Sequence, residues 1–227
     1  MMSARFGLAL VLSASAVALF ATPACAVTAK LYDQTTSCTA SSVPSLLAPT
    51  QAQFDSMAAD DFDVPADGSW GITQVNAPGV YGVFEGRTQA VNVAIYTDAG
   101  GVPGDVVPGC GYIGITDFDD SSGSLAIRLR SACILPPTVA TTKYWLGVQA
   151  IMGDADSGTS GFGVWYWKEN STQSGDLAQW ENPSNGFNEN CLTWGPRATC
   201  NADGAPDQCF LIAGVTDVIF LDGFGEP

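Results

Sequence analysis

The sequence predicts an all-β protein, a two-sheet antiparallel β-sandwich of jelly-roll-like form that is strapped by disulfide bonds. Apolar residues alternate with polar or small ones in several short segments, as at Leu125, Ile127 and Leu129, which is the period of a half-buried strand. Gly, Pro, Asp and Ser gather between such segments, at 98–105 and 119–123, and these residue types form turns. Beyond residue 26, no stretch of a dozen residues keeps the 3.6-residue period of a helix. Short strands between closely spaced turns are typical of sandwiches.

Residues 1–26 have the composition of a signal peptide. Arg5 supplies the positive charge, an apolar run covers 6–20, and Ala24 to Ala26 form a cleavage site of the A-x-A type. We therefore expect cleavage after Ala26 and a mature chain that is secreted, either extracellular or periplasmic. Cys25 allows a rival interpretation as a lipidated cysteine, but Thr22 stands where such sites usually carry leucine.

The rest of the chain is predicted as one domain. Residues 27–58 form an N-terminal strand and an irregular lead-in, 59–215 form the sandwich, and 216–227 form a C-terminal strand or tail. Within the sandwich, 171–208 is rich in Asn, Gly and Pro and is predicted as a long loop held by a disulfide. The expected strands are Trp70–Asn76, Gly79–Phe84, Val91–Thr97, Tyr112–Thr116, Ser124–Arg130, Tyr144–Ile151, Phe162–Lys168, Cys209–Val215 and Val218–Leu221.

Six cysteines follow the leader, and six allow fifteen pairings. Cys191 and Cys200 stand nine residues apart inside the long loop and would close it. Cys110 and Cys133 flank two expected strands, so both are placed at the open end of one hairpin. Cys38 and Cys209 remain, and their pairing would tie the N-terminal strand to a C-terminal one. Zinc binding by these thiols is disfavoured, because the chain has no C-x-x-C pair and no histidine.

Charge and composition exclude several classes of function. The net charge of −15 argues against nucleic acid and anionic membranes as partners, since both are negatively charged. The absence of histidine removes Ser-His-Asp and Cys-His catalysis and the H-E-x-x-H zinc site. A pair of carboxylates alone can hydrolyse a glycoside. However, the closely spaced acids Asp60, Asp61 and Asp63 are placed at a loop-to-strand edge, so an enzyme is the minority hypothesis.

Four tryptophans are the candidate ligand-binding residues. Trp165 and Trp167 alternate along one expected strand and would project from the same face of the sheet, while Trp180 and Trp194 stand in the long loop. Exposed indoles would stack on the apolar face of a sugar ring, whereas buried ones would be core residues, which is the commoner outcome. Trp180 and Trp194 are the two that we expect to be accessible.

No cofactor is expected, with calcium as the one alternative. Asp154 and Asp156 begin a D-x-D-x-G string that resembles the start of a calcium-binding loop. Gly158 and Trp165 then stand where such a loop carries further oxygen ligands. Solvated acids in a turn are therefore the preferred interpretation.

Several motifs resemble a group of bacterial secreted proteins that have no established activity. They are Ala59–Pro65, Trp70–Val75, Tyr96–Gly104, Tyr144–Trp145, Trp180–Pro183 and Cys191–Gly195. The resemblance implies a β-sandwich domain and supplies no catalytic residues. The segment 217–224 is also similar to short tails of exported proteins from some Gram-negative bacteria.

The sequence as a whole favours a secreted, non-catalytic module that binds an extracellular carbohydrate or a component of the cell envelope. A structural or adhesive surface protein without a small ligand is the alternative. A carboxylate-based hydrolase is the third hypothesis.

Overall fold

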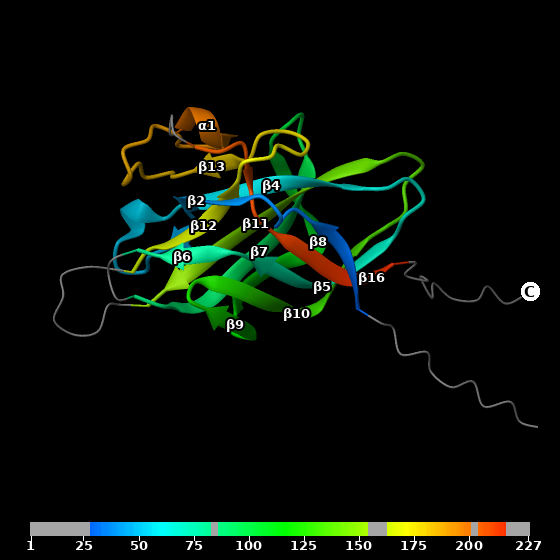
Figure 1. The fold of residues 1–227 in the computed structure, drawn as a ribbon, viewed down its shortest axis with the longest axis horizontal. Coiled ribbons are helices and arrows are strands. Elements are labelled where there is room, and N and C mark those ends of the chain that lie inside the picture. The colour runs from blue at the N-terminus through cyan, green and yellow to red at the C-terminus, as the bar shows by residue number, and fades with distance from the viewer. Residues whose placement is uncertain (1–27, 83–85, 154–162, 201–203, 217–227) are drawn as a thin grey trace, which may run out of the picture.

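The structure is a computed structural model that describes residues 28–82, 86–153, 163–200 and 204–216 (Figure 1). Nearly all of its regular structure is β-strand, as the sequence predicts. The expected leader at 1–26 and the expected strand Val218–Leu221 lie outside the described residues. Within the described part, no helix has the length and apolar character needed to cross a membrane.

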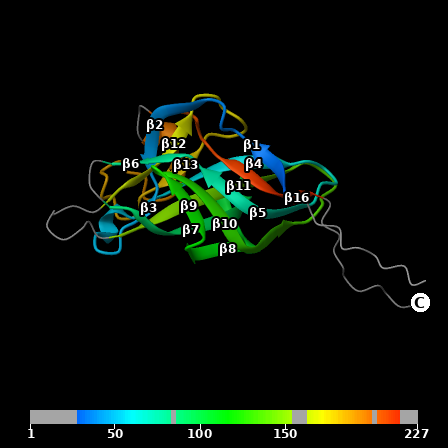
Figure 2. The same cartoon turned by 60° about the horizontal axis from the view of Figure 1, so that its bottom comes forward.

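Two large sheets form the body of the sandwich (Figures 1 and 2). In the first sheet every neighbouring pair is antiparallel. Its strands, in spatial order, are β1 (Ala29–Asp33), β16 (Leu211–Thr216), β5 (Trp70–Ala77), β10 (Ser124–Leu135) and β9 (Phe118–Ser121). The second sheet is antiparallel except for the short strand β3 (Leu46–Leu47), which runs parallel to β11. Its main path is β14 (Gly195–Pro196), β13 (Gln179–Glu181), β4 (Met57–Val64), β11 (Thr142–Met152), β7 (Thr88–Asp98) and β8 (Pro103–Ile115).

A smaller third sheet stands at one end of the sandwich. It consists of β15 (Asp207–Gln208), β12 (Trp165–Asn170), β2 (Cys38–Pro44) and β6 (Gly79–Tyr81), with β12 paired to each of the others. The described residues also hold two short helices, a 3-10 turn at Ala52–Phe54 and α1 at Arg197–Cys200. Along the chain, β4 and β5 lie in different large sheets, the hairpin β7–β8 returns to the second sheet, the hairpin β9–β10 lies in the first, and β11 lies in the second again. Such repeated crossing is a feature of jelly rolls.

The core fills the space between the two large sheets. Ile127 and Ile212 of the first sheet and Phe62 and Leu146 of the second belong to one buried hydrophobic cluster. The alternation predicted for β10 is confirmed at Leu125 and Ile127, which are buried. Leu129 is only partly buried, because the register of β10 against β5 shifts after Arg128. A register shift changes which side chains face the core.

The three predicted disulfides are confirmed as Cys38–Cys209, Cys110–Cys133 and Cys191–Cys200. The placement predicted for the second was wrong. Cys110 lies in β8 and Cys133 in β10, which belong to different sheets, so this bond links the two sheets and does not close a hairpin. Sequence spacing identified the partners, but it does not show on which sheet each strand lies.

The segments expected to be irregular contain more structure than the sequence predicts. Residues 27–58 hold β1, β2, β3 and the 3-10 turn, and β1 and β2 each pair with a strand from the C-terminal half. The long loop at 171–208 holds β13, β14, α1 and β15. The strands β13, β14 and β15 have two or three residues each, which is too short to give a periodic signal.

We predict that the disulfides contribute unequally to stability. Cys38 and Cys209 are 171 residues apart, and Cys191 and Cys200 are nine apart. In the chain-entropy model a longer loop loses more freedom in the unfolded state, giving about 5 kcal/mol for the first bond and about 2.5 kcal/mol for the second. Urea unfolding should therefore show a larger loss in the Cys38→Ala/Cys209→Ala double variant than in Cys191→Ala/Cys200→Ala. Equal losses would contradict this ranking.

Candidate functional site

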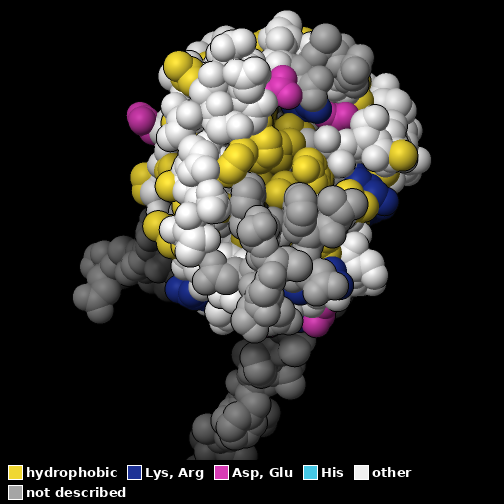
Figure 3. Space-filling view, turned by 90° about the vertical axis from the view of Figure 1, so that its left-hand side faces the viewer, with side chains coloured by type: hydrophobic (Ala, Val, Ile, Leu, Met, Phe, Trp, Pro, Cys, Tyr) yellow, Lys and Arg dark blue, Asp and Glu magenta, His cyan; other side chains and the backbone are white. Residues whose placement is uncertain are grey.

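A hollow lies between the small third sheet and the 182–200 loop, and we call it the aromatic pocket. Its volume is about 220 Å³, and its described lining consists of Ser42, Val43, Pro44, Tyr166, Trp180, Phe187, Glu189 and Arg197. Figure 3 shows apolar side chains gathered in a hollow on this end of the molecule, with acidic and basic side chains at its rim. The volume is below the ~300–1,000 Å³ typical of sites for drug-sized ligands, so the pocket suits one small ring.

The 182–200 loop is held in place by the amide of Asn182. This side chain donates from Nδ2 to the carbonyls of Gln53 (3.0 Å) and Asp55 (2.8 Å), and its Oδ1 accepts from the backbone N–H of Phe187 (3.0 Å). The disulfide between Cys191 and Cys200 closes the far part of the loop. One buried amide and one disulfide therefore fix the wall of the pocket.

Three aromatic rings form the apolar part of the pocket. Trp180 is 1% exposed, and its indole N–H donates to the carbonyl of Pro44 at 2.7 Å, so it forms the floor. Phe187 meets Trp180 at a ring-centroid distance of 6.1 Å and an angle of 59°, and Phe54 supports it from behind at 5.2 Å. Tyr166 is partly exposed on the opposite wall, and burial raises the pKa of its phenol.

A buried ion pair borders the aromatic rings. Nη2 of Arg197 lies 2.9 Å from Oε1 of Glu169, whose side chain has no exposure. The other oxygen of Glu169 accepts from the backbone N–H of Ala205 at 3.1 Å. Burial raises the pKa of Glu169, and the charge of Arg197 opposes that rise. Removing either partner would leave an isolated buried charge, so the pair fixes Arg197 in the pocket wall.

The structure places the four predicted tryptophans in three different environments. Trp165 and Trp167 face the same way with ring centroids 6.4 Å apart, as predicted, but both have no exposure and donate their indole N–H groups to backbone carbonyls. Burial, the commoner outcome for a tryptophan, is thus confirmed for Trp165 and Trp167, and these two rings offer no face on which a sugar could stack. Trp180 was expected to be accessible, and it is also buried, although it lines the aromatic pocket. Trp194 is half-buried and packs against Tyr96 at 6.0 Å, outside the lining of that pocket.

The described part of the chain contains no site that matches the calcium hypothesis. Asp154 and Asp156 lie outside the described residues. Among the residues that are described, no group of three or more His, Cys, Asp or Glu side chains could hold a metal ion. In a different turn, the acids Asp117 and Asp119 bind Arg128, at 3.0 and 2.5 Å.

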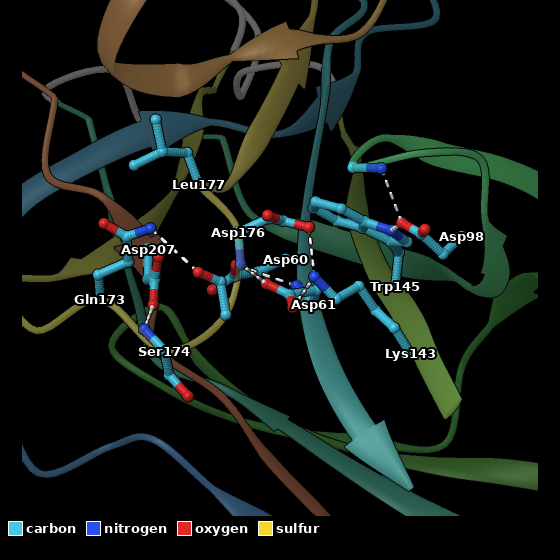
Figure 4. A network of polar contacts seen from close by, with 12 residues as sticks. Asp60, Asp61, Asp98, Lys143, Trp145, Gln173, Ser174, Asp176, Leu177 and Asp207 are labelled. Carbon is cyan, nitrogen blue, oxygen red and sulfur yellow. Dashed lines mark hydrogen bonds and ion pairs between the residues drawn. The ribbon is translucent and has the colours of Figure 1, made fainter. Parts of the chain in front are cut away.

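A second group of polar side chains is buried around β4, and Figure 4 shows that its carboxylates lie close to one another. Asp60 shares the inner face of β4 with Phe62 and has no exposure. Its Oδ2 accepts from Nε2 of Gln34 (2.5 Å) and from the backbone N–H of Gln208 (2.7 Å). The prediction that these acids stand at a loop-to-strand edge was wrong. Alternation with Ala58, Phe62 and Val64 was the signal that placed Asp60 inward.

Asp207 of β15 is the partner of Asp60 in this cluster. It has no exposure, its Oδ2 accepts from the backbone N–H of Ser174 at 2.5 Å, and its Oδ1 has no partner among the described residues. Burial raises the pKa of Asp207 to about 7. Burial, followed by the charge of Asp207, raises the pKa of Asp60 well above its usual range. Two neighbouring carboxyls in an apolar interior favour the protonated form.

Asp61 points to the opposite face of β4, where it anchors the start of the long loop. Its oxygens accept from the backbone N–H of Asp176 (3.0 Å) and contact Nζ of Lys143 (3.3 Å), which also binds the carboxylate of Asp176. Gly175 has a φ of +85°, and a Cβ there would lie 2.1 Å from Asp61. Since neither Asp60 nor Asp61 is exposed enough to meet a substrate, we assign this cluster a structural role.

Comparison of the chain with protein families, with characterised proteins and with solved structures finds no match. The geometry of the pocket therefore carries the functional argument.

We predict that the buried carboxyls make stability depend on pH. Because the folded state holds a proton on Asp207 up to a pKa of about 7 and the unfolded chain releases it near 3.8, the free energy of unfolding should fall as pH rises through this interval. Asp207→Asn keeps an acceptor for Ser174 but removes the titration, so this variant should show a flatter decline in urea unfolding between pH 4 and pH 7. The exposed Asp105→Asn is the control and should leave the slope unchanged. An unaltered slope in Asp207→Asn would contradict the assignment.

Proposed function

We propose that the protein is a secreted, non-catalytic module that binds an extracellular carbohydrate, or a cell-envelope component that contains one, in the aromatic pocket. The observation that carries this proposal is the lining of the pocket, where aromatic rings and fixed polar groups meet. Sugar rings have apolar C–H faces and hydroxyl edges, and a site of this mixed composition can contact both.

The rigidity of the pocket supports a binding role. Trp180 is buried and hydrogen-bonded, the 182–200 loop is crosslinked, and Arg197 is held by Glu169. A preformed site loses little conformational entropy when a ligand binds. Rigid aromatic residues also provide contact area at a low entropic cost.

Secretion is supported by the cysteines and by the first 26 residues of the chain. Three disulfides cross-link the described part, and such bonds form in oxidising compartments. The expected signal peptide agrees with that environment.

The hydrolase hypothesis has less support. Glycoside hydrolysis needs two carboxyl groups on either side of the scissile bond. Among the described residues that line the aromatic pocket, Glu189 is the single carboxylate. Asp60 and Asp207 are paired, but they are buried in the core.

One observation favours the adhesive alternative. Strand β8 leaves Ile113 79% exposed and Val106 45% exposed, and both line an apolar trough on the outer face of the second sheet with Tyr96 and Tyr112. Exposed apolar patches often mark contact surfaces. The alternative would be supported if this protein bound no glycan and attached to surfaces through this trough.

We predict that Phe187→Ala and Tyr166→Ala each weaken glycan binding about tenfold, because each removes one aromatic wall worth about 1.4 kcal/mol. Binding is detected first by pull-down on insoluble polysaccharides and by a glycan array, and is then measured by titration calorimetry. Val139→Ala, at a site that is 97% exposed and outside the pocket, is the control.

Trp194→Ala separates this pocket from the surface beside Tyr96 and should leave affinity unchanged. Thermal melts of every variant exclude loss of folding as the cause. Wild-type affinity in both wall variants would refute the location of the site. Release of reducing sugar by the purified protein would support the hydrolase instead.

A further inference from the structure

Two charged side chains, Arg197 and Glu189, are among the described residues that line the aromatic pocket. Arg197 is the single cation among the described residues of its lining, and the fully buried carboxylate of Glu169 at 2.9 Å neutralises it. Glu189 also lines the pocket, and its charge acts on Arg197 through space. The described lining thus contains one carboxylate, that of Glu189, in addition to the Arg197–Glu169 pair.

The aromatic rings of the pocket favour a positively charged group in the same place. The faces of Trp, Tyr and Phe rings are electronegative and attract ammonium groups by about 0.5–2 kcal/mol. Trp180 is buried beneath Phe187, so the partly exposed rings of the lining, Phe187 and Tyr166, are the ones that can meet a ligand. The net charge of the whole chain, −15, adds a long-range attraction for cations and opposes anions.

We propose that the aromatic pocket selects sugars that carry a free ammonium group over neutral and anionic sugars, an inference that rests on the proposed carbohydrate-binding function. The sugar ring packs against Phe187 and Tyr166, and its ammonium group is placed between these rings and the carboxylate of Glu189. A sugar carboxylate is disfavoured there, because the charge of Arg197 is already matched by Glu169 and Glu189 would repel it. The ligand class is therefore de-N-acetylated amino sugars of extracellular or envelope polysaccharides.

The test compares two short oligosaccharides that differ only in acetylation. Titration calorimetry at about pH 6, below the pKa of an amine, measures binding of a glucosamine oligomer and of the matching N-acetylglucosamine oligomer. We expect the free amine to bind about fivefold to tenfold more tightly, as one cation–aromatic contact and one carboxylate contact would give. An oligomer of glucuronic acid should bind more weakly than either.

Two glutamate variants distinguish a specific contact from general attraction to an acidic protein. Glu189→Gln removes the carboxylate contact but not the aromatic one, so it should lower affinity for the glucosamine oligomer, reduce its preference over the acetylated one, and leave affinity for the acetylated one unaffected. Glu181→Gln removes the same amount of charge from a half-buried strand residue outside the pocket lining and should retain the preference.

Each outcome bears on one of the two proposals. Equal or tighter binding of the acetylated oligomer, or an unchanged preference in Glu189→Gln, overturns the amino-sugar inference and leaves carbohydrate binding standing. A reduced preference in both glutamate variants also overturns it, since the effect would then be one of net charge. Failure of every glycan to bind refutes the proposed function itself.

Discussion

The side-chain alternation along β12 is the constraint on which the core and the pocket both depend. Trp165 and Trp167 have to face inward, because two indoles of this size stabilise the end of the sandwich only when buried. Tyr166 between them must then face outward, where it becomes a wall of the aromatic pocket. The close approach of β6 depends on the same arrangement, since a Cβ at Gly79 would lie 2.4 Å from the indole nitrogen of Trp165. One wall of the pocket is thus the outer face of a strand whose inner face belongs to the core.

The other walls of the pocket come from a segment that has little regular structure of its own. Its conformation is specified by particular bonds, those of Asn182 to the backbone near the 3-10 turn and the Cys191–Cys200 disulfide. Buried loop backbone is stable only where its polar groups find such partners. The long segment is therefore ordered by tertiary contacts, and these contacts are also what positions Phe187 and Arg197 beside Trp180.

Four buried ionisable side chains, those of Asp60, Glu169, Arg197 and Asp207, lie in or beside the third sheet. Glu169 and Arg197 form an ion pair. Asp60 and Asp207 lie close together, and Oδ1 of Asp207 and the side-chain amide of Gln208 have no hydrogen-bond partner in the described structure. Pairs of this kind seldom add stability relative to apolar residues of equal size. Their effect is to fix which segments meet, because β4, β15 and the loop at Ser174 are joined by hydrogen bonds with one geometry.

The sequence by itself determined the β-class, most of the long strands and the three disulfide partners, because side-chain period, turn residues and cysteine spacing are local or countable properties. From the sequence we could not tell that Cys110 and Cys133 lie in different sheets or which tryptophans are buried. Nor could we tell that Tyr166 lies next to Phe187 and Arg197. Those features were decided by the tertiary structure. They depend on which strands cross between sheets and on contacts between segments far apart in the chain, and short strands such as β13 and β15 form only when those neighbours supply their hydrogen bonds.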